Sequence, residues 1–257
     1  MDSILHSNLQ PTITIIIATY NELCNIQKTL DSIYYQKYTN IEVIVIDGNS
    51  DDGTIEILIK NQDLLSKWLS EKDSGLYDAW NKGLNLSSGE WIMFLGAGDT
   101  LNSDALNSYA NSIKINNKEL NFITSKGRLN DNNGKFIREI GKSLNKKTFQ
   151  KYMTICHPGS LHHKSLFLKN GNYDINYKIC ADYEFLMRSL SDLNTSFIDK
   201  ALVDILDGGI SSYSFKGLYE TKIIKMSKRP KILVEWEWII ALIKLFLKIK
   251  LLNRKLS

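Results

Sequence analysis

The chain has 257 residues, of which 43% are hydrophobic and 23% charged, and its formal net charge is +4. These values exclude a disordered chain, a collagen-like repeat and a coiled coil, and the length allows one large domain or two small ones. The charge excess is too small to indicate a nucleic-acid partner, and the three cysteines form no CxxC pair, so neither a disulfide framework nor a zinc site is indicated.

The beginning of the chain carries no export signal. The first ten residues lack the basic region and the apolar core of a signal peptide. No uninterrupted apolar run approaches the roughly 20 residues that a membrane-spanning helix requires. We therefore expect a protein of the reducing cytoplasm.

In the first hundred residues, short runs typical of strands, β-branched at 12–18 and 41–46, alternate with segments whose apolar residues recur at helical spacing. The runs predict strands at 12–18, 41–46, 67–70 and 91–95, and the periodic segments predict helices at 22–35, 52–59 and 76–86. Short connections between them indicate right-handed βαβ units, and hence an α/β fold with a mostly parallel, doubly wound sheet.

Polar residues follow three of these strands at their carboxyl ends. They are Thr19, Tyr20, Asn21 and Glu22 after the first strand, Asp47 after the second and Asp99 after the fourth. Ligands of doubly wound sheets bind beyond the carboxyl ends of the strands. The sequence therefore predicts a site on one rim of the sheet.

The second half is less regular. It predicts a helix at 101–113, a hairpin of strands 121–126 and 135–140 around the turn 131–134, a helix at 178–190 and a strand at 195–206. No internal repeat and no low-complexity linker divides the chain.

Two of the rim aspartates have structural alternatives. Asp99 follows the glycine-rich turn 96–98, where an ion can approach the backbone closely, and a carboxylate there can hold Mg²⁺ or Mn²⁺. It can equally cap the helix predicted after it. Asp47 opens a generic Asp-Gly-Asn-Ser turn, for which composition alone favours a structural role.

The segment 71–83 combines charges, aromatic rings and amides where a strand-to-helix loop needs only a turn and a cap. Asp78, Asn81 and Lys82 lie at helical spacing and share one face. That face is either solvated or belongs to the same rim as Asp47 and Asp99.

Six segments follow one another between residue 11 and about residue 215. They are TIIIATYNE, IEVIVIDGNSDDGT, SEKDSGLYDAWNKGLNLSSGEWIMFLGAGDTL, ICHPGSLHHKSLF, NGNYDINYKICADYEFLMRSL and DGGISS. In this order they resemble the inverting family 2 glycosyltransferases with the GT-A fold, which implies a Rossmann-like, mostly parallel mixed sheet flanked by helices. The forms YDAWNKG and ADYE resemble bacterial enzymes that build O-antigen or capsule repeat units.

The resemblance implies a donor pocket at the rim. Thr19, Tyr20, Asn21 and Glu22 would line the pocket for base and ribose, and Asp47 would contact one of these. The residues that would border the donor's nucleotide and sugar are Asp73, Asp78, Asn81 and Lys82.

The resemblance also implies a metal and a base. Asp99 matches the last aspartate of the family's DxD-type motif, whose metal bridges the donor diphosphate, but Gly96 and Gly98 stand where carboxylates often do. Asp182 matches the catalytic base. One metal aspartate and one base aspartate imply single displacement with inversion, in which the cation stabilises the leaving diphosphate and the base deprotonates the acceptor hydroxyl.

Two features of the acceptor half stay open. His157 either contacts phosphate or acceptor, or bonds the loop backbone as a structural histidine. The stretch 208–211 is either a loop that closes over the donor or a plain turn.

The end of the chain is basic and apolar. From Lys222 to Ser257 there are 10 basic and 2 acidic residues, whereas Met1 to Thr221 carry 22 basic and 26 acidic ones. The polar residues Glu237, Lys244, Lys248 and Lys255 form one narrow helical stripe, with tryptophans and large aliphatic residues around it. This pattern favours a helix in a membrane interface over one packed on the protein or in a homodimer.

Together these features predict a membrane-associated, metal-dependent inverting glycosyltransferase on the inner face of the plasma membrane. We expect a domain at 1–221, with a nucleotide-sugar half at about 11–100 and an acceptor half at about 101–221, and a membrane-associating segment at 222–257 that binds through residues 231–255. The expected partners are a nucleotide-sugar donor, most simply a UDP-sugar, and a lipid-linked saccharide acceptor of O-antigen, lipopolysaccharide or capsule biosynthesis, and not nucleic acid.

Two alternatives remain. A sugar nucleotidyltransferase would need a glycine-rich, basic loop after the first strand, and residues 18–22 contain neither glycine nor lysine. A degenerate member that binds a nucleotide sugar without turnover is compatible with the reduced metal motif.

Overall fold

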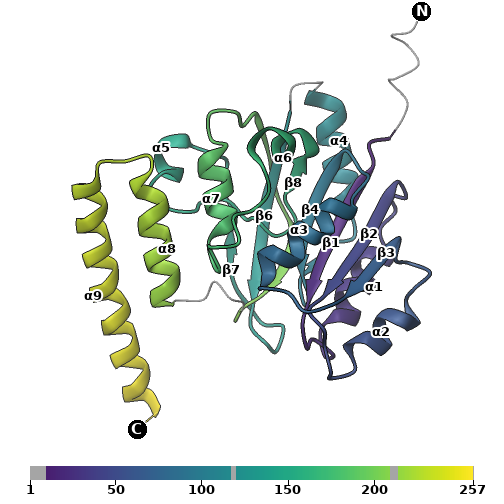
Figure 1. Ribbon diagram of the computed structural model, residues 1–257, viewed down its shortest axis with the longest axis horizontal. Coiled ribbons are helices and arrows are strands. Elements are labelled where there is room, and N and C mark those ends of the chain that lie inside the picture. Colours follow the sequence, from purple (N-terminus) through teal and green to yellow (C-terminus); the bar gives the residue numbers. More distant parts are fainter. Residues whose placement is uncertain (1–9, 117–119, 209–213, 257) are drawn as a thin grey trace, which may run out of the picture.

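The computed structural model describes residues 10–116, 120–208 and 214–256, with side chains up to residue 247. This part of the chain forms a nine-stranded mixed sheet with helices on its faces, and a helical pair, α8 and α9, stands at one end (Figure 1). The strands follow the order β3-β2-β1-β4-β8-β6-β9-β5, and β7 pairs with β6. The expected α/β class and the GT-A-like layering are confirmed.

The first half agrees with the sequence-based elements. It contains β1 (Ile13–Thr19), α1 (Ile26–Tyr34), β2 (Ile41–Asp47), α2 (Thr54–Lys60), β3 (Lys67–Ser70), α3 (Leu76–Leu86) and β4 (Trp91–Gly96). All seven residues of β1 are buried, as its uninterrupted β-branched composition predicts for a strand covered on both faces. Helix α1 begins later than expected, because the backbone after β1 first makes a turn.

The register of the parallel strands brings their carboxyl ends to one rim. Thr19 pairs with Asp47, and Ala18 pairs with Gly96 on the other side of β1. Asp47 in turn pairs with Ser70 at the end of β3. The predicted rim is therefore present.

The second half contains shorter and partly antiparallel elements. They are β5 (Thr100–Leu101), α4 (Ala105–Asn116), β6 (Phe122–Asn130), β7 (Phe136–Ile140), α5 (Lys146–Phe149), β8 (Leu161–His163), α6 (Lys164–Asn170), α7 (Ala181–Arg188), β9 (Thr195–Leu206), α8 (Phe215–Met226) and α9 (Lys231–Leu256). The predicted hairpin and last strand are confirmed.

The helix predicted from residue 101 begins only at Ala105. Thr100 and Leu101 form β5 instead and pair antiparallel with Asp204 and Val203 of β9. The structural alternative for Asp99, a cap of the following helix, is therefore wrong: five residues separate the two.

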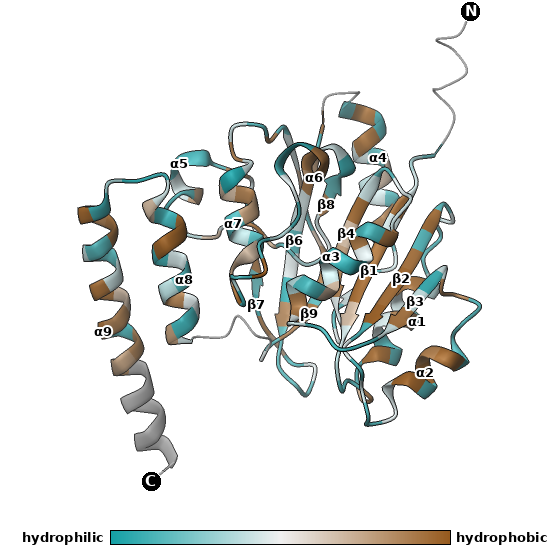
Figure 2. Ribbon diagram, in the orientation of Figure 1, coloured by the Kyte–Doolittle hydropathy of each residue, from teal (hydrophilic) through white to brown (hydrophobic). Residues whose placement is uncertain are grey.

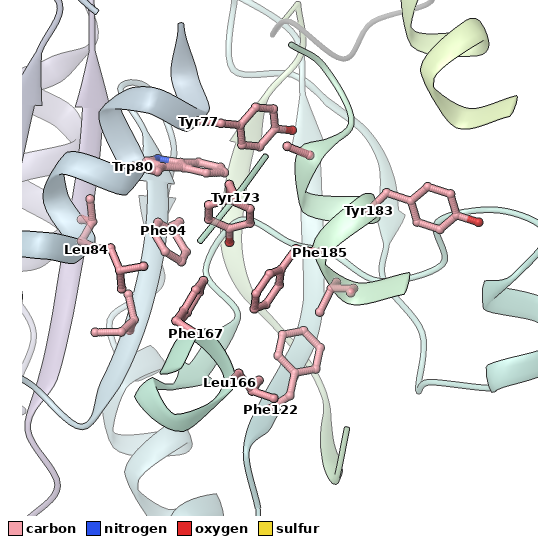
Figure 3. Close-up of a cluster of buried hydrophobic side chains, with 14 of the residues drawn as sticks. Tyr77, Trp80, Leu84, Phe94, Phe122, Leu166, Phe167, Tyr173, Tyr183 and Phe185 are labelled. Atoms are coloured by element: carbon pink, nitrogen blue, oxygen red, sulfur yellow. The ribbon is translucent and has the colours of Figure 1, made fainter. Parts of the chain in front are cut away.

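An aromatic cluster fills the space between α3 and α7. Figure 3 shows the rings of Trp80, Phe94, Tyr173 and Phe185 meeting there. The ring of Trp80 lies 4.9 Å from that of Phe94, and the ring of Tyr173 lies 5.3 Å from that of Phe185. The cluster fixes the position of α7 relative to the parallel strands.

Helices α8 and α9 pack against each other, and the boundary expected between residues 221 and 222 falls inside α8. No helix among the described residues is long and apolar enough to cross a membrane. Residues 209–211 of the predicted closing loop lie outside the described residues.

Gly83 on α3 offers a direct test of how closely this helix approaches β1. A Cβ atom at this position would overlap the Cγ2 methyl group of Ile16. Gly83→Ala should lower the free energy of unfolding by about 1–2 kcal/mol in urea denaturation, because overpacking outweighs the better helix propensity of alanine. The matched control is Asn85→Ala on the exposed side of the same helix, which should change stability by less than about 0.5 kcal/mol. Equal stability of the two variants would contradict this packing.

Candidate active site

The turn after β1 forms one wall of the rim. Asn21 adopts a left-handed conformation with φ of 52°, and its backbone N–H donates to Ser50 Oγ at 2.8 Å. The ring of Tyr20 is 62% exposed, so it remains available to a ligand. The backbone N–H of Glu22 donates to Thr54 Oγ1 at 2.9 Å, which ties this turn to α2. Thr19 is buried, and its hydroxyl has no partner among the described residues.

Asp47 is occupied by its own turn. Its carboxylate accepts the backbone N–H of Ser50 at 2.9 Å and the Ser70 hydroxyl at 2.6 Å, and the residue is fully buried. These bonds favour the structural role that composition indicated. A contact with a base or ribose stays a prediction.

Gly48, directly after Asp47, marks a place where a side chain is missing. A Cβ atom there would lie 2.9 Å from Asp73 Oδ2 and 3.2 Å from the Tyr20 ring. The β1 turn, the β2 turn and the loop after β3 therefore meet at this point, and the small residue leaves room between Tyr20 and Asp73.

The other residues of the α3 segment divide into two groups. Asp78 accepts the N–H of Ser74 at 2.9 Å, and Lys82 pairs with Glu71 at 2.7 Å, so both shape the loop that carries Asp73. Asn81 exchanges two hydrogen bonds with the backbone of Tyr173, at 2.9 and 3.1 Å. Its amide thus joins α3 to the second half of the chain, and sugar contact by these residues stays a prediction.

Asp99 closes the turn after β4. Its carboxylate accepts the N–H of Gly96 at 3.1 Å, while the N–H of Ala97 donates to Ala18 at the end of β1. Burial raises the pKa of Asp99 to about 7, although the bond from Gly96 acts in the opposite direction. The carboxyl group is therefore poised to lose its proton when a positive charge approaches.

Asp182 lies in the first turn of α7 and is partly buried. Tyr77 of α3 places its hydroxyl 2.9 Å from Asp182 Oδ1 and 2.7 Å from the carbonyl oxygen of Ile179. Burial raises the pKa of Asp182, and the Tyr77 hydroxyl, as a donor to the carboxylate, partly opposes this. A carboxylate of raised basicity is suited to accept a proton from an alcohol.

The backbone before Asp182 is held from α8. Glu220 is buried, and its carboxylate accepts the N–H groups of Lys178, Ile179 and Cys180, each at 2.9 Å. The Lys178 ammonium group also donates to the carbonyl oxygen of Ser74 at 3.0 Å. The segment before Asp182 is thus bonded to the loop of Asp73 through Lys178 and Ser74, whereas Asp182 itself contacts Tyr77 of α3.

His157 lies inside the aromatic cluster, and only 2% of it is exposed. Its Nε2 bonds the Tyr173 hydroxyl at 3.1 Å, its ring stacks on Trp80, and burial lowers its pKa to about 3. An uncharged, enclosed imidazole favours the structural alternative over phosphate contact. His162, which is also buried, has a pKa well below its usual range for the same reason.

The structure thus brings the β1 turn, the turn of Asp47, Asp73 and the turn of Asp99 to one edge of the sheet, and it places Asp182 against Tyr77 of α3. The roles of these residues stay predictions. Sequence reasoning missed Tyr77 as a neighbour of Asp182 and Glu220 as the group that holds the backbone before it. Tyr77 stands within the quoted YDAWNKG motif, which was a usable signal. Glu220 had none, because its partners lie about 40 residues away in the chain.

Comparison with known proteins decides the family. Residues 14–171, more than half of the chain, match the family described as Glycosyl transferase family 2. The chain belongs to glycosyl transferase family 2. It is 30% identical over 190 residues to an uncharacterized glycosyltransferase of Mycobacterium tuberculosis, covering 70% of this chain and 69% of the relative. It is 29% identical over 220 residues to a PGL/p-HBAD biosynthesis glycosyltransferase of Mycobacterium bovis, covering 84% and 82%.

Solved structures share the fold. Residues 1–349 of S. aureus TarS in complex with UDP-GlcNAc match with a TM-score of 0.69 and 19% identity, over 87% of this chain and 69% of that one. The mannosyltransferase PcManGT from Pyrobaculum calidifontis, in complex with GDP-Man and Mn²⁺, gives a TM-score of 0.63 at 17% identity, over 90% and 70%. A longer TarS chain matches with a TM-score of 0.66, and this chain spans 41% of its length.

Asp99 could hold a divalent ion only if phosphate oxygens of the bound nucleotide supplied further ligands. Among the described residues, no three histidine, cysteine or carboxylate side chains gather as metal ligands. Mg²⁺ commonly takes one or two carboxylates and completes its shell with phosphate oxygens and water. One buried carboxylate of raised pKa, in a turn that is bonded to the end of β1 through Ala97 and Ala18, is compatible with that arrangement.

Tyr77→Phe tests the electrostatics around Asp182. Removing the hydroxyl donor destabilises the ionised carboxylate, so the pKa of Asp182 should rise further above its usual range. The measurement is a ¹³C carboxyl NMR titration, with Asp182→Asn identifying the signal. Tyr183→Phe is the control, because its hydroxyl donates to the Phe149 carbonyl at 2.8 Å and leaves the Asp182 side chain unaffected. An unchanged or lower pKa in Tyr77→Phe would contradict the assignment.

Proposed function

We propose that the chain is a metal-dependent inverting glycosyltransferase that moves a sugar from a UDP-sugar to a lipid-linked saccharide. The observation that carries this proposal is the rim itself. Asp99 closes the turn after β4, Asp182 lies in the first turn of α7 against Tyr77 of α3, and Lys178 joins the segment before Asp182 to Ser74 in the loop of Asp73. Membership of glycosyl transferase family 2 supports glycosyl transfer as the reaction class.

The donor's nucleotide would lie between the β1 turn and the loop after β3. The exposed Tyr20 ring and the Asp73 carboxylate face the space beside Gly48, which suits a flat base and a ribose with hydroxyl donors. TarS in complex with UDP-GlcNAc supports a uridine nucleotide here, although the likeness is one of fold. Asn21 and Glu22 would act mainly by holding the turn.

Asp99 would hold Mg²⁺ or Mn²⁺ together with the diphosphate. Such an ion supplies electrostatic stabilisation of the charge that develops on the leaving nucleoside diphosphate. The complex of PcManGT with Mn²⁺ supports the use of a divalent ion. The raised pKa of Asp99 means that cation binding and proton loss are coupled at this carboxyl group.

Asp182 would be the general base. In a single displacement, the acceptor oxygen forms its bond to the anomeric carbon while the bond to the diphosphate breaks, and the acceptor proton passes to the carboxylate. No covalent enzyme intermediate is needed, so the anomeric configuration inverts. The raised pKa of Asp182 makes the carboxylate a stronger base than an exposed aspartate.

Two observations support a lipid-linked acceptor and a role in biosynthesis, namely the C-terminal helix α9 and the name of a relative. A basic, apolar C-terminal helix is suited to meet an acceptor at the cytoplasmic leaflet. The relative from Mycobacterium bovis is named for PGL/p-HBAD biosynthesis. We propose O-antigen or capsule assembly as the corresponding role in a bacterium.

Asp182→Asn tests the base. Loss of the proton acceptor should lower the turnover of a UDP-sugar panel with Mn²⁺ by about 10²–10⁴-fold. UDP affinity, measured by calorimetry, should stay unchanged because the carboxylate faces the acceptor. The control is Asp104→Asn, whose carboxylate pairs with Lys200 at 3.3 Å on the surface. Full turnover in Asp182→Asn would overturn the role.

Asp99→Asn tests the metal site by binding rather than turnover. Mn²⁺ affinity in the presence of UDP, followed by electron paramagnetic resonance, should fall by about tenfold or more, because the only carboxylate proposed to hold the ion becomes neutral. Asp104→Asn again serves as the control. The native protein could instead bind the UDP-sugar, fail to bind Mn²⁺ and show no turnover. That result would favour the alternative of a family member that binds a nucleotide sugar without catalysing transfer.

A further inference from the structure

One face of α9 is apolar and uncovered. Eight large hydrophobic side chains, each between 43% and 69% exposed, lie on it: Ile232, Leu233, Trp236, Ile239, Ile240, Ile243, Phe246 and Leu247. At 3.6 residues per turn they fall within an arc of about 140° and extend along about 24 Å of helix. Figure 2 shows the hydrophobic residues along this helix. We call these eight residues the outer face of α9.

The opposite face of α9 is fixed against α8. Val234 is buried, and the Lys222 ammonium group lies 3.9 Å from the centre of the Trp238 ring. Glu237 receives two hydrogen bonds from Arg229. The helix therefore cannot rotate to bury the outer face without breaking these contacts.

The charge around the outer face is positive. Both acidic residues of the segment 222–257 form ion pairs. Glu235 pairs with Lys222 at 2.8 Å, and Glu237 pairs with Arg229 at 2.6 Å. Of the side chains that the structure describes in this segment, Lys228, Lys231 and Lys244 are exposed and form no ion pair. The uncovered apolar surface is thus flanked by unneutralised cations.

We propose that the outer face of α9 docks on an anionic lipid bilayer, with the helix lying in the headgroup interface. Large aliphatic residues together with Trp236 and Phe246 suit the boundary between headgroups and acyl chains. The free lysines complement anionic headgroups. A second copy of the chain is the poorer occupant, because pairing two outer faces would bring two basic segments together.

The docked helix would be adjacent to the active site through α8. Glu220 of α8 holds the backbone that leads to Asp182, and α9 packs on the same helix. Figure 1 shows α9 running toward the side of the molecule at which the strands of the rim end. The inference depends on the proposed function only for its biological purpose, namely to bring the base near a lipid-linked acceptor.

The test is flotation of the full chain with vesicles, in the absence of donor and metal, so that its outcome is independent of catalysis. The native protein should bind phosphatidylcholine vesicles that contain phosphatidylglycerol and bind phosphatidylcholine alone about tenfold more weakly. The triple variant Trp236→Ser, Ile240→Ser and Ile243→Ser should lose binding by about tenfold or more. These positions are exposed, so circular dichroism should show an unchanged fold.

The matched control removes the same number of exposed hydrophobic side chains from other surfaces. It combines Tyr35→Ser, Ile115→Ser and Leu168→Ser, which are 72%, 81% and 79% exposed. This variant should bind vesicles like the native chain. Equal binding by both triple variants would overturn the proposal. A second result would also overturn it. In this case the native protein does not bind vesicles, sedimentation shows that it is a dimer, and the triple variant of Trp236, Ile240 and Ile243 is a monomer.

Discussion

The arrangement depends on the position of β1 between β2 and β4, with all three strands parallel and in register. Thr19 pairs with Asp47, and Ala18 pairs with Gly96, so β1, β2 and β4 end at the same edge of the sheet. Each exit carries polar side chains or glycine. The rim is therefore a consequence of strand register, and a displacement of β1 by one residue would turn its buried side chains to the opposite face and move Thr19 away from the turn of Asp47.

The second half of the chain is attached to α3 and to the loop of Asp73 through a small number of long-range bonds. Tyr77 reaches Asp182 and Ile179 from α3, and Glu220 holds three consecutive N–H groups from α8. The aromatic cluster behind them excludes water and makes these polar contacts strong. Thus the parallel strands form the proposed donor edge, whereas α3 and α8 together hold Asp182, the proposed base. Helix α9 packs on α8 at the outside of the molecule.

Much of the fold could be predicted from the sequence, because β1 and β2 are short β-branched runs and the helices have apolar residues at helical spacing. Strand 67–70, helix 76–86 and strand 195–206 have the predicted boundaries. The helix after Asp99 was predicted too early, because β5 is only two residues long and exists through pairing with β9, which local periodicity does not encode. Likewise, the burial of His157 in the aromatic cluster depends on tertiary packing, as do the hydrogen bonds of Glu220 to the backbone before Asp182. Local sequence does not encode either feature. The outer face of α9 was visible as composition, but only the contacts with α8 show which side of the helix remains free.

The central claim is that the nucleotide sugar binds at the carboxyl ends of β1, β2 and β4, with Asp182 across from the leaving diphosphate. The most direct measurement is a crystal structure of the full chain with UDP and Mn²⁺. The account predicts the uridine between Tyr20 and Asp73, the diphosphate and the ion at Asp99, and Asp182 facing the position of the transferred sugar. A nucleotide bound away from this rim would contradict the account. So would a metal ion that binds the diphosphate without contacting Asp99.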